Sequence, residues 1–225
     1  MPAIVCRRSC NRGDADIYVP NTFAEADPAE IAALMRAASF AALVTSVDGR
    51  PVATHLPLLL DDTGGRPGKL LGHVARANDH WKSFDGEAEA LAVFSGPHAY
   101  ISPSWYESAN MVPTWNYAAV HVYGRPQVIE DTDAVLELLA RLVGTYESDA
   151  TGNWSMAKSD PALMRGMTKG VVAFEMPIER IEAKWKMSQN RKREDAAGAI
   201  AGLRKLSGAD NDAVAAAMEQ RLADR

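Results

Sequence analysis

The sequence is poor in cysteine, since its two thiols, Cys6 and Cys10, both lie among the first ten of 225 residues. Two cysteines so close together cannot cross-link a domain of this size, which excludes a disulfide framework. No third cysteine follows them, and the nearest histidine is His55, so the pair is short of the four ligands of a structural zinc site. The chain must therefore fold around an ordinary hydrophobic core, which its 47% hydrophobic content can supply.

Long apolar runs and an excess of positive charge are also absent. No apolar run reaches the roughly 18 residues that a membrane span needs. No apolar segment follows the N-terminal arginines as it would in a secretory signal. We therefore expect a cytoplasmic protein without a membrane partner. The net charge is −5, so the chain as a whole gives no electrostatic support to nucleic-acid binding.

Several signatures of enzyme families are missing from the sequence. It has no G-x-G-x-x-G or P-loop segment, no G-x-S-x-G and no H-E-x-x-H, which argues against the dinucleotide, phosphoryl-transfer, serine-hydrolase and zincin classes. The five histidines do not pair at tight ligand spacing with one another or with a carboxylate cluster. We predict no metal site, and no residue is identified as a catalytic acid, base or nucleophile.

Apolar periodicity indicates a mixture of strands and segregated helices. Helices are predicted at Pro28–Ala38, Asp131–Glu147, Pro161–Met167, Glu194–Leu206 and Asp212–Leu222. Strands are predicted at Phe40–Thr45, Val52–Leu60, Leu70–Ala75, Ala90–Phe94, Ala99–Ser102, Trp115–Gly124, Val171–Met176 and Ile181–Met187, with a break at Gly96–Pro97. Short connections such as Asp48–Gly49 mean antiparallel hairpins. The pattern predicts an α+β fold with an antiparallel barrel of about six strands.

The chain divides by composition into three parts. Residues 1–16 are polar and without period, and are expected to form a disordered N-terminal extension. Residues 17–190 carry the strands and form the main domain. Residues 191–225 are rich in alanine and form a C-terminal helical appendage.

Polar side chains at one strand end suggest an anion site. Arg76 and Asn78 follow an apolar strand and begin a short helix. A helix N-terminus offers free N–H groups, and a guanidinium adds a permanent charge with paired donors. The alternative is that Arg76 is a solvated charge and Asn78 only a cap. His55 and His73 sit in apolar strands nearby, and buried, hydrogen-bonded histidines are the alternative for them.

Two further segments are unusual. The first, 102–117, holds the densest group of aromatic residues, which could wall a flat heterocycle or pack in a core or a dimer. The second, 184–191, gathers two lysines, an arginine, an indole and two amides at a strand end. It fits either an anionic, partly aromatic ligand or a solvated strand face.

Taken together these segments resemble the PaiB family of FMN-binding proteins. The resemblance rests on six blocks in order, at 18–20, 53–57, 72–78, 96–106, 112–121 and 184–191, and covers about 17–206. It implies a flavin-reductase-like split barrel that binds FMN at a homodimer interface, and a negative transcriptional regulator. The stretch 107–111 looks shorter than in many members, and the first fifteen residues appear extra.

The resemblance and the residue chemistry together imply a cofactor site. The FMN phosphate is expected at Arg76, Asn78 and the backbone near Ala75. His55, Leu56 and His73 are expected to line one side of the isoalloxazine. The other side is expected to be closed, from the partner chain, by Trp115, Asn116, Lys186 and Gln189. A lysine at the ring edge would stabilise negative charge on reduced flavin.

Three functions remain open at this stage. The first is a regulatory flavoprotein, whose only candidate DNA-facing surface is a basic group with a solvated helix face as its alternative: Arg191, Lys192, Arg193, Arg204 and Lys205. The second is an FMN-dependent oxidoreductase or flavin reductase that uses NAD(P)H, because split barrels often host such chemistry. The third, a haem-binding protein, would need His55, His73 or His121 as an axial ligand.

Overall fold

The structure is a computed structural model that describes residues 17–65 and 67–223. The predicted extension at 1–16, with Cys6 and Cys10, lies outside the described residues. The chain forms two compact units. Unit 1 comprises the chain up to Ala38, Phe94–His121 and Ile181–Arg225, and unit 2 comprises Ser39–Val93 and Val122–Arg180. The boundary expected at residue 190 is not tested by this division and stays a prediction.

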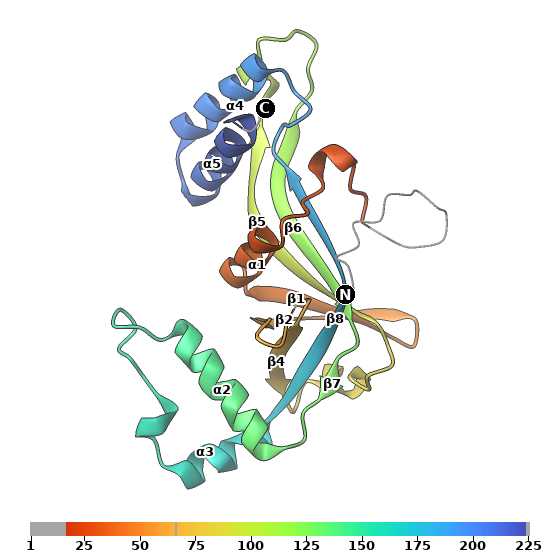
Figure 1. Ribbon diagram of the computed structural model, residues 1–225, viewed down its shortest axis with the longest axis vertical. Helices are drawn as coiled ribbons and strands as arrows, with labels where there is room; N and C mark the ends of the chain where they lie inside the picture. The colour runs from red at the N-terminus through yellow and green to blue at the C-terminus, as the bar shows by residue number, and fades with distance from the viewer. Residues whose placement is uncertain (1–16, 66, 224–225) are drawn as a thin grey trace. The chain divides into compact units, whose positions relative to one another are not determined.

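One antiparallel sheet carries strands through both units (Figure 1). Its strands are β1 (Phe40–Val47), β2 (Arg50–Pro57), β3 (Leu59–Asp61), β4 (Lys69–Ala75), β5 (Ala90–Ile101), β6 (Thr114–Gly124), β7 (Gln127–Val128) and β8 (Val171–Lys186). The order is β2-β1-β5-β6-β8-β4-β3, with β7 paired to β8. The α+β class is confirmed. The count of six strands was too low, since the described residues form eight, and their order runs openly from β2 to β3 without closing.

Two predicted interruptions are absent. Strand β5 continues through Gly96–Pro97, and β8 joins the strands predicted at Val171–Met176 and Ile181–Met187. Gly96 lies in tight packing rather than in a turn, because a Cβ built on it would come 2.6 Å from Leu34 Cδ1 and 3.1 Å from Ala118 Cβ. The sequence signal of a break was therefore the mark of a close contact inside unit 1.

In unit 2, helix α2 (Thr132–Tyr146) covers part of the sheet, and α3 (Pro161–Met167) follows it. Asp131 caps α2 by accepting a 2.8 Å hydrogen bond from the Ala134 N–H. The apolar face predicted for this helix packs on β3, β4 and β8, in a core of Leu59, Leu71, Val135, Leu138, Leu142 and Ala173. The 3-10 helix η2 (Asp79–Ser83) lies against β1 and β2.

In unit 1, helices α4 (Arg193–Leu206) and α5 (Ala209–Ala223) lie side by side (Figure 1). Two glycines of α4 receive Trp105, the last residue of the 3-10 helix η3 (Pro103–Trp105). Helix α1 (Pro28–Ala37) begins as predicted, with the Asp27 carboxylate accepting from the Ala29 N–H at 2.8 Å. Glu30, in the first turn of this helix, accepts hydrogen bonds from Arg221 of α5.

No helix among the described residues is long and apolar enough to cross a membrane.

An ion pair fastens α2 to the end of β3 and gives a pH-dependent prediction. Arg141 donates to the Asp61 carboxylate at 3.0 Å, and the Thr63 hydroxyl donates to it at 2.7 Å. These bonds lower the pKa of Asp61 from 3.8 to about 2. Because the folded pKa lies below the unfolded one, the stabilisation is complete above about pH 4 and is lost as the pH falls toward 2.

We expect Asp61→Asn to lower the free energy of unfolding by about 1–2 kcal/mol at pH 7, allowing for solvent screening. Urea unfolding between pH 7 and pH 3 measures it. The difference from the parent protein must shrink as the pH is lowered below 4. A difference that is constant across this range would show that the carboxylate charge is not the cause.

Candidate functional site

The ten predicted cofactor residues fall into two groups. His55, Leu56, His73, Ala75, Arg76 and Asn78 belong to unit 2, whereas Trp115, Asn116, Lys186 and Gln189 belong to unit 1. Each group is described within its own unit.

Arg76 is the best-defined donor of the unit 2 group. It follows the end of β4 and is exposed. Its Nε donates to the Lys169 carbonyl at 2.9 Å, and its Nη2 donates to the Val171 carbonyl at 3.0 Å. The guanidinium lies 5.7 Å from the centre of the Trp81 ring, whose Nε1 donates to the Arg76 carbonyl at 3.0 Å. Within the described residues Nη1 makes no hydrogen bond, so a held, pre-oriented cation still offers donors to an anion.

Asn78 is hydrogen-bonded to both η2 and β2. Its carboxamide oxygen accepts from the His80 backbone N–H at 3.1 Å, which is the capping role expected from the sequence. Its Nδ2 donates to the Thr54 hydroxyl of β2 at 3.2 Å. The helix that it caps is a 3-10 turn of five residues. It is too short to provide the helix dipole expected to attract an anion. The anion site therefore depends on side-chain donors.

His73 carries an unsatisfied buried nitrogen. Its Nδ1 is inaccessible and has no hydrogen-bond partner among residues 17–65 and 67–223, and burial lowers the pKa of this histidine. A buried polar atom without a partner is uncommon in folded proteins. The role of His73 beside the cofactor stays a prediction.

His55 and Leu56 are adjacent on β2 and point to opposite faces. His55 is exposed and stacks on Phe40, with ring centres 6.3 Å apart. Leu56 is only 3% exposed and belongs to the core. The two side chains therefore cannot line one surface together, and any shared contact with a ring would involve their backbone. Their assignment stays a prediction.

In unit 1, Lys186 lies at the end of β8 among other cations. Its ammonium donates to the Thr114 hydroxyl and, at 2.8 Å, to the Trp115 carbonyl. Burial, followed by the positive charges of Lys184 and Arg191, lowers its pKa. The local potential is thus positive and suits an anionic ligand atom.

The other unit 1 predictions differ in access. Asn116 is completely buried, and its Nδ2 donates to Ser188 Oγ at 2.9 Å and contacts Met218 Sδ at 3.2 Å. Gln189 closes a local turn by accepting from the Met187 N–H at 2.6 Å. Trp115 is 53% exposed. Of this group, Trp115 and Lys186 are open to a ligand, whereas Asn116 already has polar partners inside the unit.

Trp115 belongs to an exposed aromatic cluster on unit 1. Its ring centre lies 5.9 Å from that of Tyr100 and 6.2 Å from that of His98. Tyr100 is also exposed, at 45%. Three neighbouring rings at the surface form an apolar patch of the kind found at binding interfaces.

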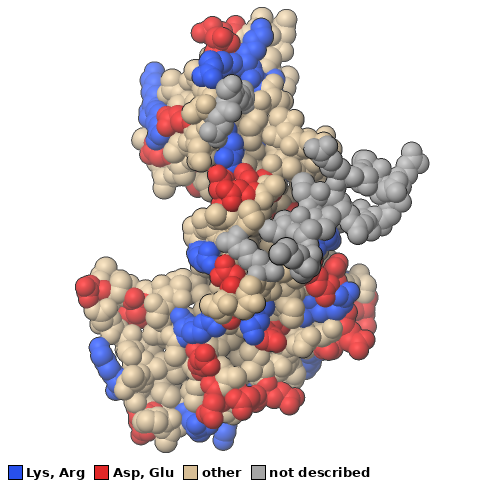
Figure 2. Space-filling view, viewed as in Figure 1, with Lys and Arg blue, Asp and Glu red and all other residues tan. Residues whose placement is uncertain are grey.

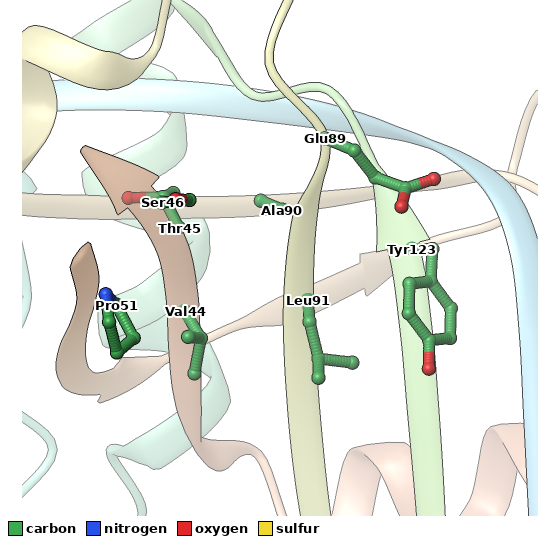
Figure 3. A pocket seen from close by; sticks show the side chains of 8 residues that line it. All are labelled: Val44, Thr45, Ser46, Pro51, Glu89, Ala90, Leu91 and Tyr123. Atoms are coloured by element: carbon green, nitrogen blue, oxygen red, sulfur yellow. The ribbon is translucent and has the colours of Figure 1, made fainter. Parts of the chain in front are cut away.

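A pocket of about 250 Å³ opens elsewhere on unit 2, between β1, β2, β5 and β6 (Figure 3). Figure 3 shows Val44, Leu91 and Pro51 along it, with Glu89 and Tyr123 together at one side. None of the ten predicted residues lines it. Its one charged lining residue is the Glu89 carboxylate, which would repel a phosphate, so this pocket is not the predicted cofactor site.

Sequence reasoning missed three residues of these sites. Thr54 and His80 bridge β2 and η2, and Lys184 is buried to 93%, with its ammonium donating to the Tyr18 carbonyl at 2.8 Å. The sequence left Lys184 either on a solvated strand face or beside an anionic ligand, and did not predict its burial. The rings of Tyr18 and Tyr117 lie 5.4 and 5.3 Å from that ammonium. Both tyrosines are far from Lys184 in the sequence, so residue spacing alone could not show that they contact it.

Two basic residues of the C-terminal helices, Arg204 and Arg193, have partners within unit 1. Arg204 pairs with Glu219 at 2.9 Å and with Asp212 at 3.5 Å, and Arg193 donates to the Leu222 carbonyl at 3.1 Å. Figure 2 shows basic and acidic side chains interspersed over the visible face rather than gathered by sign. This arrangement favours the solvated helix face over a DNA-binding surface.

Comparison with known proteins agrees with the predicted family. The family described as "Putative FMN-binding domain" matches residues 17–180. The protease synthase and sporulation protein PAI 2 of Bacillus subtilis is 36% identical over 206 residues, covering 92% of this chain and 98% of that protein.

Solved structures support the fold. The flavocytochrome Anf3 of Azotobacter vinelandii aligns with a TM-score of 0.59 at 18% identity, covering 78% of this chain and 75% of that one. The FAD and haem binding protein of Mycobacterium smegmatis aligns with a TM-score of 0.56 at 17% identity, covering 77% and 78%. At these identities the likeness concerns the fold alone. The domain match and the Bacillus relative extend over most of the sequence, and the chain therefore belongs to the PaiB family of FMN-binding-domain proteins.

Proposed function

We propose that this protein binds FMN and does so as a homodimer in the cytoplasm. The observation that carries the proposal is Arg76, a cation held by two backbone carbonyls with one nitrogen left to donate. The Asn78–Thr54 pair and the unpartnered His73 Nδ1 belong to the same unit. A phosphate needs a fixed charge with donors around it, and these residues supply both.

The residues of unit 1 suit the ring of the cofactor. FMN, when bound, supplies electron and hydride transfer through its isoalloxazine. Lys186 would place a positive charge at the ring edge and stabilise the negative charge of the reduced form. Trp115 offers an exposed flat surface. We propose that a second copy of the chain contributes these two residues, as the family resemblance implies.

Homodimer formation is supported by the exposed aromatic cluster of His98, Tyr100 and Trp115. Aromatic residues are enriched at protein interfaces, where they bury large areas at little entropic cost. We place the subunit contact at this cluster. Sedimentation of the parent protein and of Trp115→Ala measures it, because loss of the indole should shift the chain toward the monomer.

A regulatory role is the first functional candidate and an oxidoreductase the second. Family membership supports regulation, but the ion pair of Arg204 with Glu219 argues against direct DNA contact through that residue. The positive surroundings of Lys186 favour a reducible flavin, which either role could use. We therefore propose a flavin-dependent sensor or regulator, with an NAD(P)H-dependent flavin reductase as the alternative.

The absorption spectrum of the purified protein tests the proposal. We expect flavin bands, with FMN retained or taken up in equal molar amount to the chain, and a dimeric mass. Rapid bleaching by NADH or NADPH would favour the oxidoreductase, and salt-sensitive, sequence-selective DNA binding the regulator. A Soret band on haem addition, without uptake of flavin, would replace both by the haem alternative. Colourless, monomeric protein that takes up no flavin contradicts the proposal.

A further inference from the structure

Buried His80 of η2 links two strands through both of its ring nitrogens. The residue is 4% exposed. Its Nε2 lies 2.8 Å from the Thr45 hydroxyl of β1, and its Nδ1 lies 2.8 Å from the Thr54 hydroxyl of β2. Thr45 Oγ1 in turn lies 3.1 Å from Ser83 Oγ, and Thr54 Oγ1 accepts from Asn78 Nδ2. The Thr54 hydroxyl therefore connects the imidazole to the predicted phosphate ligand Asn78.

The direction of the first half of this chain follows from a backbone acceptor. Ser83 donates its only hydroxyl hydrogen to the His80 carbonyl, at 2.8 Å, because a carbonyl can only accept. The Thr45–Ser83 bond must then use the Thr45 hydrogen. Thr45 Oγ1 is left to accept from His80, so His80 Nε2 carries the hydrogen.

The second half is fixed by a backbone donor. The His80 N–H donates to Asn78 Oδ1, which orients the carboxamide and points Nδ2 at Thr54. Thr54 Oγ1 accepts from Asn78, and its own hydrogen is directed to the unprotonated His80 Nδ1. Neutral His80 with its hydrogen on Nε2 thus satisfies every contact. The opposite tautomer would leave the Thr45–Ser83 contact without a hydrogen.

Protonation of Nδ1 changes one bond only. The Nε2 side is unaffected, but Nδ1–H now donates to Thr54 Oγ1, which already accepts from Asn78 Nδ2. The Thr54 hydroxyl hydrogen is released and needs another acceptor. We propose that His80 is a positioning residue that couples proton uptake to anion binding: when an anion binds at Arg76 and Asn78, Thr54 donates to it and His80 becomes charged. This inference rests on the proposed FMN site and adds a regulatory residue to it.

The surroundings of His80 make the titration interpretable. The main contacts of η2 are with β1 and β2, and from these strands the two threonines hydrogen-bond to the ring. On its own segment the ring meets Phe84, at 5.2 Å between centres. Asp79 and Lys82, the charged residues of η2, are exposed and paired with each other at 2.7 Å. No charged side chain among the described residues contacts the imidazole, and burial lowers its pKa.

The sign of the effect follows from these surroundings. Burial favours the neutral form of His80, which gains its proton as the pH falls. An anion that accepts from Thr54 favours the charged form, so binding takes up a proton and tightens as the pH is lowered. The gain is limited to about tenfold per pH unit. The FMN phosphate itself takes up a proton near pH 6, so the parent protein must be compared with a variant that lacks only the imidazole.

The test measures FMN binding by calorimetry between pH 5.5 and 8 in buffers of different ionisation enthalpy. The parent protein should take up more protons than His80→Gln and than Thr54→Val, which keeps the imidazole but removes the hydroxyl. With riboflavin, which lacks the phosphate, the parent protein, His80→Gln and Thr54→Val should take up equal numbers of protons. The ¹⁵N shifts of His80 in the parent protein should report hydrogen on Nε2 at pH 8, a readout that needs no variant.

Equal proton uptake by the parent protein and His80→Gln, or hydrogen on Nδ1 at pH 8, would overturn this inference and leave FMN binding intact. Failure of the parent protein to bind FMN at every pH would remove the proposed function, and the coupling with it.

Discussion

Gly198→Ala is expected to lower the free energy of unfolding by about 2–3 kcal/mol. Gly198 lies inside α4, where a Cβ would come 2.0 Å from the Trp105 carbonyl oxygen. The obstacle is backbone in η3, whose Trp105 N–H is bonded to the Ser102 carbonyl at 3.2 Å. It cannot rotate away as a flexible side chain would, so helix and turn must separate.

Gly144→Ala provides a matched control, because Gly144 also lies within a helix. A Cβ there meets nothing within 4 Å, so alanine should raise stability by about 0.5–1 kcal/mol through its helix propensity alone. Urea unfolding of the two variants, with flavin uptake as a check on folding, gives the comparison. If both alanine substitutions stabilise the protein to the same extent, α4 does not pack against the Trp105 carbonyl at Gly198.

Gly198 and Gly202 of α4 form a contact surface that the sequence alone did not reveal. Gly198 and Gly202 stand four apart in an alanine-rich helix, so they share one face and both meet Trp105. From the sequence this helix was predicted at Glu194–Leu206, and the structure has it at Arg193–Leu206. A small-residue face can be recognised by spacing, whereas the aromatic residue that fills it lies ninety residues away and is identified only by the fold.

The elements that were predicted well depend on local signals. The Asp27 and Asp131 caps and the apolar face of α2 are encoded within one or two helical turns. The Asp48–Gly49 turn was also predicted, and both residues have positive φ, at 51° and 74°. The break expected at Gly96–Pro97 was wrong because a glycine can equally mark a close approach of Leu34 from another element.

The candidate site was predictable only in part, for a related reason. Residue type indicated Arg76 and Asn78 as phosphate ligands, with a cap as the alternative for Asn78; the structure shows the cap, and the phosphate role stays a prediction. The sequence could not show that Asn116 is fully buried beside Ser188 and Met218, since its strand neighbours are aromatic and open. The sequence did not single out His80, because its ring contacts threonine hydroxyls of two different strands. These contacts and the directions of their hydrogen bonds depend on how the strands pair in the fold.

Arg76→Gln is expected to weaken FMN binding about 10- to 100-fold, the effect of losing a charged hydrogen bond of about 1.5–3 kcal/mol. The variant keeps a polar side chain but removes the charge that the Lys169 and Val171 carbonyls hold in place. Because the residue is exposed, its urea midpoint should change little. The loss should therefore appear in cofactor affinity, measured by fluorescence titration.

Two comparisons decide whether the phosphate is the group that Arg76 binds. Arg50→Gln removes the same charge from another exposed position and should leave FMN affinity within about twofold, because screened charges interact weakly. Riboflavin has the same ring without the phosphate, so Arg76→Gln should bind it as the parent protein does. Equal losses for FMN and riboflavin would place Arg76 at the ring and not at the phosphate. An unchanged FMN affinity would mean that the anion site lies elsewhere, because Arg76 carries the positive charge that we propose to bind the phosphate.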